Sequence, residues 1–365
     1  MTNAMRSSSG FILPLTLWIV AIMGLVVATM NMWVQTAVAN ARSLREKTDS
    51  QLAMSDIRNE LIYALAARPK SSRGLEVGTG LPVLNNSDFM AALSTTIVSS
   101  RSIALDHRPY VTQSHPDYVI QIQDGRGLFQ MNFNNQVSLR RFLSAMKFPE
   151  AERNRLTDTL LDYTDEDNYT RLAGAEAIDY QRLGLPPPAN ESLLTPYEAK
   201  RVMAWSEEKL LWEADMRSPL LTTCEIAGFN PNTAPVPVLM AQMPRLSADA
   251  IARLIEARRT KTFANQAQLT QAAGELVYDE AFFYSFVPSE CLIVDLLNTK
   301  SGEHNRFSLT LRPLGKGQPW RYDYELRIPA QYALRADQID GTAFFPAPES
   351  LHTGADEQPL LNAGR

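Results

Sequence analysis

The chain has 365 residues, of which 45% are hydrophobic and 21% are charged, and its formal net charge is −5. This composition is ordinary for a folded protein and lacks the basic excess that nucleic-acid binders usually carry. Only two cysteines are present, Cys224 and Cys291, with four histidines and no CxxC spacing, so the sequence does not predict a zinc site.

An apolar run begins near the N-terminus. Residues 11–30 carry no charged side chain, and about 20 helical residues, each rising 1.5 Å, cross the apolar core of a bilayer. A cleaved secretory signal would have a shorter apolar region followed by a small-residue cleavage site. Length alone does not separate a plain signal anchor from other membrane helices. We therefore expect a membrane-spanning segment over 11–32, with its type still open at this point.

The ten residues before this run carry a more specific signal. Residues 1–10 are polar, contain Arg6 and end in Gly10, which is followed directly by Phe11. This order resembles the leader of type IV prepilins and of type II secretion pseudopilins. The resemblance implies cleavage between Gly10 and Phe11 by a prepilin peptidase and N-methylation of Phe11. It also implies that the apolar helix stays as the membrane anchor and later as part of a filament core.

The fifth residue of the mature chain departs from the usual pattern of that family, because it is Leu15 instead of glutamate. In the family this glutamate pairs with the N-terminal amine of a neighbouring subunit, and an unpaired carboxylate in an apolar filament core would be costly. A subunit without the glutamate lacks one attraction for joining beneath an existing filament end. Leu15 therefore favours a place at the end of a filament.

Helical periodicity continues beyond the membrane and should stop before Pro69, so we expect one helix over 11–68. Strand patterns follow at 118–123 and 128–133, and the Asp-Gly-Arg-Gly sequence between them is a turn signal. We assign 69–137 to the first part of a small pilin-like α/β domain.

The pattern becomes helical over 138–286. This stretch is too long for a loop and has its own apolar periodicity, which predicts an inserted α-helical domain. Strand patterns return at 291–296, 307–311 and 322–328, and the last two alternate apolar and polar residues like a hairpin. We assign 287–329 to the second part of the sheet.

The remaining residues, 330–365, lack periodicity and are rich in proline, glycine and aspartate, so a flexible tail is expected. The predicted fold class is α+β. It consists of a long N-terminal transmembrane helix packed on a small antiparallel sheet, with a large α-helical domain inserted into the sheet.

Carboxylates gather in the predicted α-domain, where 162–167 reads Asp-Tyr-Thr-Asp-Glu-Asp and Gly-Ala-Glu follows at 174–176. Such groups repel one another unless they are solvated or share a cation, and hard oxygen ligands suit Ca²⁺. The spacing is not that of an EF-hand, and a solvated acidic loop at a helix end is the alternative. If calcium binds here, the candidate ligands are Asp162, Asp165, Asp167 and Glu176.

The segment 229–272 begins with Phe-Asn-Pro-Asn-Thr-Ala-Pro and contains three short helical patterns, with Ser247 as the N-cap of the second. It resembles a helix-hairpin-helix unit, in which glycines let backbone N–H groups approach a phosphate. Here the turn, Met-Pro-Arg-Leu-Ser, has no glycine, and acidic residues surround the arginines. Packing or partner binding is therefore expected instead of nucleic-acid binding. A DNA-binding minor pilin of an uptake or type IV pilus machine stays the alternative function.

Motifs of an enzyme are not found in the sequence. It contains no recognisable Ser/His/Asp or Cys/His constellation, no HExxH and no phosphate loop. The chain is instead expected to be the substrate of the prepilin peptidase.

In their order and spacing, these segments resemble the minor pseudopilin K of the type II (general) secretion pathway between residues 1 and 328. The motifs that carry the resemblance are the leader without glutamate at position 15, the Asp-Gly-Arg-Gly stretch with Asn132-Phe133-Asn134, the acidic cluster with Gly174-Ala175-Glu176, Pro188-Ala189-Asn190 with Thr195-Pro196-Tyr197-Glu198, and the Asn-Thr-Ala-Pro helix pair.

The resemblance implies a subunit at the tip of the pseudopilus that helps initiate its assembly and the export of folded proteins across the outer membrane. It implies a single-pass anchor in the bacterial inner membrane and a soluble domain in the periplasm. The expected partners are the I- and J-type minor pseudopilins, the major pseudopilin filament and the prepilin peptidase. In the oxidising periplasm we expect Cys224 and Cys291 to form a disulfide.

Overall fold

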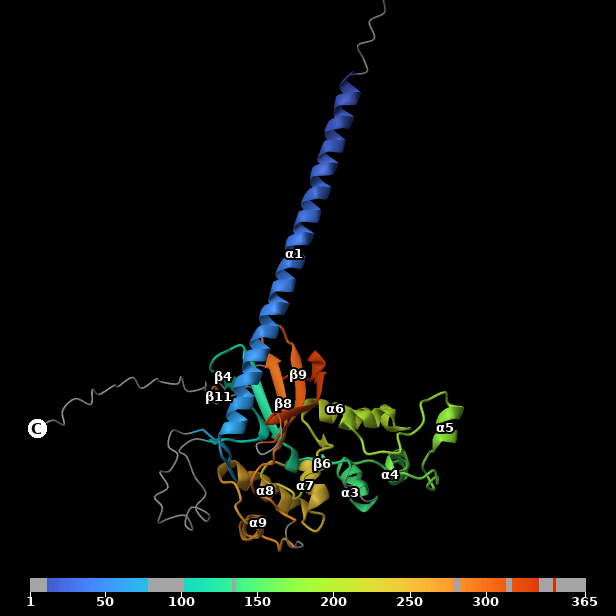
Figure 1. The fold of residues 1–365 in the computed structure, drawn as a ribbon, viewed down its shortest axis with the longest axis vertical. Helices are drawn as coiled ribbons and strands as arrows, with labels where there is room; N and C mark the ends of the chain where they lie inside the picture. The colour runs from blue at the N-terminus through green and yellow to red at the C-terminus, as the bar shows by residue number, and fades with distance from the viewer. Residues whose placement is uncertain are drawn as a thin grey trace, which may run out of the picture. The chain divides into compact units, whose positions relative to one another are not determined.

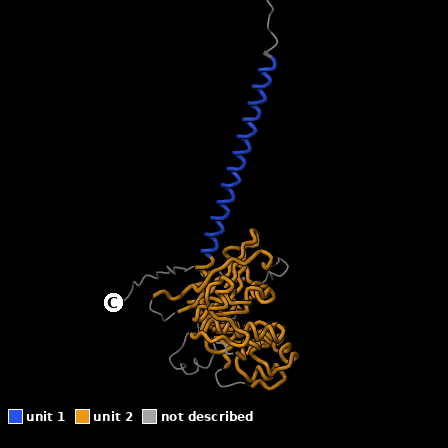
Figure 2. The backbone as a smooth tube through the Cα atoms, turned by 90° about the vertical axis from the view of Figure 1, so that its right-hand side faces the viewer, with its two compact units in different colours: residues 1–56 blue, residues 57–365 orange. Residues whose placement is uncertain are grey.

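The computed structural model describes residues 12–77, 102–132, 136–278, 283–312, 317–334 and 344–345. They form a mixed fold of one long helix, an antiparallel sheet and a large group of shorter helices (Figure 1). The predicted α+β class is confirmed. The chain divides into two compact units, residues 1–56 and residues 57–365 (Figure 2).

Helix α1 runs from Ile12 to Ala67 and contributes to both units. Within the described ranges it is the one helix long and apolar enough to cross a membrane, with a window of mean hydropathy 2.2. Leu15 lies in α1, whereas Gly10 and Phe11 fall outside the described residues. The helix ends shortly before Pro69, because proline lacks an N–H and disfavours a helical conformation in the residue before it.

The main sheet belongs to the second unit and has the strand order β10-β9-β8-β5-β4-β11. Neighbouring strands are antiparallel, except that β11 pairs with β4 in parallel. In chain order the strands are β4 (Asp106–Thr112), β5 (Tyr118–Asp124), β8 (Cys291–Asn298), β9 (His304–Leu311), β10 (Trp320–Arg327) and β11 (Phe344–Phe345). The strand predicted over 118–123 and the three later strand patterns are all present, and β9 and β10 form the expected hairpin.

The last turns of α1 pack on this sheet. The buried positions of these turns recur at helical spacing: Ile57, Leu61 and Leu65. Burying each such side chain stabilises the fold by about 1.5–3 kcal/mol. Arg58 Nη2 donates a hydrogen bond of 2.6 Å to Glu325 Oε1 on β10, and its guanidinium lies 4.9 Å from the ring centre of Phe307 on β9. Both kinds of contact hold the end of α1 on β9 and β10.

Short strands form two further sheets. One contains β1 (Lys70–Ser71), β2 (Gly74–Glu76) and β3 (Ser102–Ile103), and the other pairs β6 (Phe129–Gln130) with β7 (Leu221–Thr222) in parallel. The strand expected over 128–133 is therefore wrong in length, because the described strand is only Phe129–Gln130 and it pairs with β7. A 3₁₀ helix, η1 (Gly125–Gly127), turns the chain away from β5. Phe129 N then donates to Leu220 O at 2.8 Å instead of pairing with the main sheet.

The described chain between β6 and β8 is mainly helical (Figure 1). Its helices are α3 (Gln136–Ala145), α4 (Glu150–Thr164), α5 (Ala177–Arg182), α6 (Lys209–Arg217), α7 (Val236–Gln242), α8 (Ala248–Thr260) and α9 (Gln266–Ala273), with the 3₁₀ helices η2 (Pro196–Arg201) and η3 (Trp205–Glu207). Their apolar faces share one core, which includes Phe142, Leu160, Trp205 and Leu239. Since β5 and β8 are neighbours in the main sheet, these helices form an insertion between paired strands.

The expectation of a flexible tail over 330–365 is wrong for part of that range. A 3₁₀ helix, η4, occupies Ala330–Tyr332, and Phe344 and Phe345 form β11 at the edge of the main sheet beside β4. Phe345 is buried. Burial of such a side chain stabilises by about 1.5–3 kcal/mol, enough to hold a short pairing in a sequence that lacks periodicity.

Candidate functional site

The predicted acidic cluster lies where α4 ends and the chain turns toward α5 (Figure 1). Asp162 is in the last turn of α4, Asp165 is the C-cap of α4, Asp167 follows in the loop, and Glu176 is the N-cap of α5. The last turn of α4 contains no basic residue. Its terminal carbonyl groups therefore add negative potential beside these carboxylates. The local fold thus gathers negative charge that a cation would neutralise.

Three of the four predicted ligands converge. Oxygen atoms of Asp165, Asp167 and Glu176 lie within 4.8 Å of one another. Glu176 is only 4% exposed. Apart from the capping-box contact between its carboxylate and the Asp179 N–H at the start of α5, neither of its carboxylate oxygens has a hydrogen-bond partner among the described residues. The same holds for Oδ1 of Asp165. Buried carboxylate oxygens without donors destabilise a fold, and a bound cation would remove that penalty.

Asp162 is fully buried and has a different role. Its Oδ1 accepts a hydrogen bond of 2.5 Å from Arg171 Nη1, and its Oδ2 accepts from the Arg171 backbone N–H at 3.1 Å. Arg171 Nη1 also lies 2.5 Å from Asp165 Oδ2. Gly174 is so close that a Cβ there would lie 1.8 Å from Asp162 Oδ2, so a side chain does not fit. Asp162 shapes the loop that carries the other three carboxylates.

Glu176 shows the electrostatic effect of this crowding. Burial raises the pKa of its carboxyl group, and the charges of Asp162, Asp165 and Asp167 raise it further. With its folded-state pKa above the ordinary value, the cation-free fold binds this proton more tightly than the unfolded chain. Its stability therefore falls as the pH rises through the interval between the two pKa values. A set of hard oxygen ligands of this kind suits Ca²⁺ or a similar divalent ion.

The helix pair α7–α8 already carries a carboxylate at its turn. Ser247 caps α8 as predicted, and its Oγ accepts from the Ala250 N–H at 3.1 Å. The Ser247 N–H donates to Glu275 Oε2 at 3.1 Å, and the Ser247 hydroxyl donates to Glu275 Oε1. These hydrogen bonds lower the pKa of the Glu275 carboxyl group. The chain's own carboxylate thus occupies the helix N-terminus that this type of motif would offer to a phosphate.

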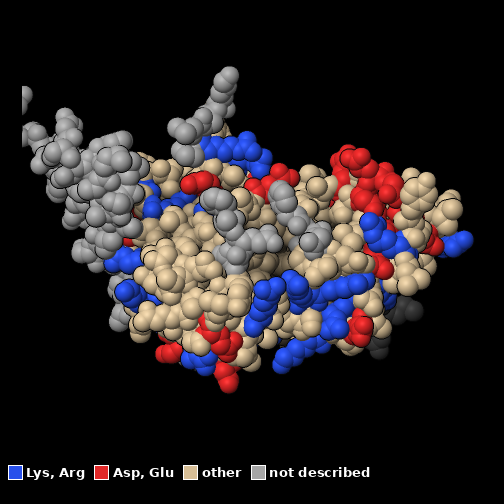
Figure 3. Space-filling view, turned by 90° about the horizontal axis from the view of Figure 1, so that it is seen from below, with Lys and Arg blue, Asp and Glu red and all other residues tan. Residues whose placement is uncertain are grey.

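Arginines near the helix pair are engaged in contacts within the chain. Arg253 Nε donates to Ala273 O at 2.8 Å, and Arg258 Nη1 donates to the carbonyl oxygens of Pro231 and Ala234, each at 2.8 Å. Figure 3 shows one face of the molecule, on which acidic and basic side chains are both exposed. Because these arginines are bonded to backbone carbonyls within the chain, their contacts favour packing of the helix pair over binding of a phosphate backbone.

Asp124, at the end of β5, was not evident from the sequence as an important residue. It is fully buried, and its Oδ2 accepts from Asn230 Nδ2 at 2.9 Å and from Thr233 Oγ1 at 3.0 Å. Its Oδ1 accepts from the N–H and the hydroxyl of Ser289 at 2.8 and 2.7 Å. The Asn-Pro-Asn-Thr segment therefore attaches the helical insertion to the main sheet. Asp124 and Asn230 are 106 positions apart, and no local pattern connects them.

A second buried group joins α6 to the sheet. Arg306 on β9 is fully buried, and its Nε and Nη2 donate to the two carboxylate oxygens of Asp295 on β8 at 2.7 and 2.8 Å. Its Nη1 donates to the Asp215 carbonyl on α6 at 2.6 Å and to the Tyr197 hydroxyl at 3.2 Å. His107 Nε2 lies 2.9 Å from Asp295 Oδ2. Although burial alone would raise the pKa of Asp295, Arg306 holds it well below the usual range.

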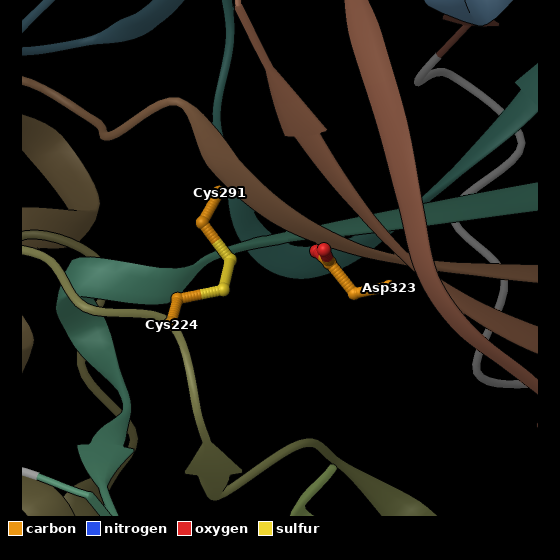
Figure 4. A group of neighbouring side chains, drawn as sticks. All are labelled: Cys224, Cys291 and Asp323. Atoms are coloured by element: carbon orange, nitrogen blue, oxygen red, sulfur yellow. A yellow bond between two sulfur atoms is a disulfide. The ribbon is translucent and has the colours of Figure 1, made fainter. Parts of the chain in front are cut away.

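Cys224 and Cys291 are linked by a disulfide, with their Cα atoms 6.5 Å apart (Figure 4). Cys224 follows β7 and Cys291 begins β8, so the bond is a third link between the helical insertion and the main sheet. Asp323 of β10 points toward the sulfurs (Figure 4). Its carboxylate accepts hydrogen bonds from Thr310 Oγ1 at 2.6 Å and from Arg321 Nε at 2.7 Å.

Comparison with known proteins gives a consistent family. Two family models match the chain, and both describe the type II secretion system (T2SS) protein K: one covers residues 120–211 and the other covers residues 229–277. The first range contains the acidic cluster, and the second contains the Asn-Pro-Asn-Thr segment and the helix pair. Among curated protein sequences, none matches this chain.

A solved structure with a similar fold is a chain of the GspK–GspI–GspJ complex from the enterotoxigenic Escherichia coli type 2 secretion system. Its sequence is 16% identical, the match covers 78% of this chain and 98% of that chain, and the TM-score is 0.45. Two regions of this chain are therefore similar to protein K of the type II secretion system, which supports a GspK-like minor pseudopilin.

Proposed function

We propose that this protein occupies the tip of the type II secretion pseudopilus, where it helps initiate filament assembly and the export of folded proteins across the outer membrane. The observation that carries the proposal is the large helical insertion, α3 to α9, between the paired strands β5 and β8. Subunits of such a filament stack along their N-terminal helices. Close-packed neighbours leave no room for this bulk at every level, whereas the end of the filament does.

The N-terminal sequence supports the same role. Cleavage between Gly10 and Phe11 would leave α1 as a single-pass anchor in the inner membrane, with the rest of the chain in the periplasm. Leu15 stands where glutamate is usual in this family, so the subunit lacks one attraction for joining beneath a filament end. It would instead begin the filament and be pushed outward by later subunits.

The proposed partners are other pseudopilins. The similar structure from Escherichia coli contains GspK together with GspI and GspJ, and we propose that the corresponding minor pseudopilins assemble with this chain. The major pseudopilin would then extend the filament, and the prepilin peptidase would process the leader.

Antibody labelling of sheared pseudopili tests the tip position. The protein should appear at one end of each filament only. N-terminal sequencing should begin at methylated Phe11, both for the wild type and for Leu15→Glu, because the substitution leaves Gly10 unchanged. Wild-type protein spread along the filaments would contradict the tip position, and an intact leader on the membrane-inserted protein would contradict the proposed processing.

We also propose that Asp165, Asp167 and Glu176 bind a calcium ion, with Asp162 holding their loop in place. The support is the convergence of three carboxylates. In addition, Oδ1 of Asp165 lacks a donor within the described part of the chain, and the buried carboxylate of Glu176 has no donor there beyond the capping-box N–H of Asp179. Calcium takes 6–8 oxygen ligands in flexible geometry. Backbone carbonyls of the loop and water would complete its coordination.

Calcium removal is expected to lower the melting temperature of the wild-type protein by about 5 °C. A ligand present at a hundred times its Kd stabilises the native state by about 2.7 kcal/mol, and each kcal/mol shifts the melting temperature of a domain of this size by about 2 °C. Differential scanning calorimetry of the full-length protein in detergent, with calcium and with chelator, measures the shift.

Glu176→Gln gives a sharper test, because its effect should depend on calcium. With calcium it should melt below the wild type, since a charged ligand is lost. With chelator it should melt at the same temperature or higher, because a buried charge with a raised pKa is removed. Glu191→Gln changes an exposed glutamate outside the converging group and is the matched control. An equal effect of Glu176→Gln under both conditions would refute calcium binding.

A further inference from the structure

A groove separate from the acidic cluster lies between α6 and the end of β10. Its volume is about 600 Å³. On one side it is lined by Tyr197 and Lys200 of η2 and by Trp212 of α6, and on the other by Leu326 and Arg327 of β10. The lining therefore combines aromatic and aliphatic surface with long basic side chains.

The basic side chains of this groove lack carboxylate partners. Lys200, Lys209 and Arg327 are exposed, and within the described ranges none of them forms an ion pair. The Lys200 ammonium group lies 4.8 Å from the ring centre of Trp212, a cation–π contact that leaves its hydrogen-bond donors available. Among the described lining residues, Glu213 is the one with a negative charge. The groove is therefore a local region of positive potential in a chain whose net charge is −5.

The strand that borders the groove is the edge of the main sheet. β10 pairs with β9 on one side, and no described strand pairs with it on the other. An unpaired edge presents a row of backbone N–H and C=O groups to which an extended peptide can add as a further strand. Because Leu326 and Arg327 belong both to β10 and to the groove, such a peptide would lie with its side chains beside the groove.

We propose that this groove and the outer edge of β10 form a docking site for an extended acidic segment of a partner protein. The segment would pair with β10 through its backbone and place apolar side chains against Leu326 and Tyr332. Its carboxylates would meet Lys200, Lys209 and Arg327. A lipid or a polysaccharide has no backbone row that matches a strand edge, so the geometry favours a polypeptide, and the charge of the groove favours an acidic one.

This docking site is independent of the tip position and of calcium binding. None of the groove's lining residues belongs to the acidic cluster. Evidence against the tip position or against calcium binding would not bear on the docking site. Evidence against peptide docking would likewise not bear on either of those proposals.

Fluorescence anisotropy with a defined peptide tests the site. The probe is a fluorescein-labelled peptide of alternating glutamate and valine, titrated with the full-length protein in detergent at increasing salt. Two further peptides are controls, one with lysine in place of glutamate and one with alternate valines replaced by proline, which cannot pair as a strand. Binding of the first peptide should weaken as salt rises, and both controls should bind at least about tenfold more weakly.

Protein variants then locate the binding. Lys200→Glu combined with Arg327→Glu reverses two groove charges and should weaken binding by about tenfold or more. Lys261→Glu reverses an exposed lysine at the end of α8, outside the groove, and should leave binding unchanged. Thermal melts check that each variant is folded. The proposal is overturned if the glutamate peptide does not bind, if binding survives the double reversal, or if heparin or anionic vesicles bind in the groove and the peptide does not.

Discussion

Replacing Arg306 by methionine is expected to lower the free energy of unfolding by about 3–5 kcal/mol. The substitution leaves Asp295 buried without its counter-charge and removes the donors to the carbonyl oxygens of Asp215 and Met216 at the end of α6. Methionine keeps much of the volume of the side chain, so the loss is electrostatic instead of a cavity effect. Denaturant unfolding of the full-length protein in detergent, followed by tryptophan fluorescence, measures it.

Arg321→Met is the matched control for this substitution. Arg321 pairs with Asp323 at 2.7 Å; the Arg321 side chain is 56% exposed and that of Asp323 is 10% exposed. Because water reaches the Arg321 guanidinium, and because Ser308 and Thr310 still donate to Asp323, the loss should be only about 1 kcal/mol. Combining Arg306→Met with Asp295→Leu removes both buried charges and should recover part of the lost stability. If Arg306→Met lowered the free energy of unfolding no more than Arg321→Met does, water would have to reach Asp295. That would contradict the complete burial of Asp295.

The same network makes stability depend on pH. A carboxyl group whose folded-state pKa is depressed, as that of Asp295 is, stabilises the fold above its unfolded-state pKa and loses this contribution as the pH falls toward the folded-state pKa. Arg306→Met removes the cause of the depression. The difference in unfolding free energy between the wild type and Arg306→Met should therefore narrow as the pH falls from neutral into the acid range.

The regular strands could be predicted from the sequence because each is an apolar or alternating run bounded by turn residues, as in β5, β8, β9 and β10. Strand β4 could not. Pro109 lies inside it, the pairing with β5 shifts register between Asp106 and Pro109, and His107 has a positive φ of 65°. The proline and the bulge interrupt the alternation of apolar and polar residues that identifies a strand. This segment is a strand because it pairs with its neighbours in the folded sheet.

The strand expected over 128–133 shows the opposite error. Its residues have the right pattern, and the predicted turn is present as the 3₁₀ helix η1, but β6 after it pairs with β7 and not with the main sheet. Gly127 lies so close to Thr233 that a Cβ would be 2.7 Å from the Thr233 backbone carbon. The contact between Gly127 and Thr233 determines the direction of the chain after β5. These residues are far apart in the sequence, so a local turn signal cannot predict that direction.

The acidic cluster could be predicted because its members are close together in the sequence, between the last turn of α4 and the start of α5, so residues near in the chain are also near in space. Even so, the sequence did not separate Asp162, which holds Arg171, from the three carboxylates that converge. Arg306 could not be predicted at all, because its partners on the helical insertion, Tyr197 and Asp215, are 109 and 91 positions away. Buried polar networks of this kind depend on the assembled fold.

Replacing both Cys224 and Cys291 with serine is expected to lower the free energy of unfolding by about 4 kcal/mol. The two residues are 67 positions apart, and in the chain-entropy model a cross-link that closes a loop of this length restricts the unfolded chain by about that amount. The measurement is the denaturation midpoint of the full-length protein in detergent. Dithiothreitol should shift the wild type toward the variant and leave the variant itself unchanged, and two titratable thiols in the unreduced native protein would contradict the bond.

The disulfide and the Arg306 network both fasten the helical insertion to the main sheet, which makes their combined effect informative. If the insertion and the sheet unfold together, removing the disulfide from Arg306→Met should add its full cost, because the two sites share no partner. If the Arg306→Met insertion instead detaches while the sheet stays folded, unfolding should become two transitions by fluorescence. In that case the disulfide would be the remaining covalent link between the insertion and the sheet. Its reduction should then shift only the unfolding transition of the insertion. A single transition with additive costs would mean that the insertion and the sheet unfold as one unit, which the proposed position at the end of a filament pushed from below would require.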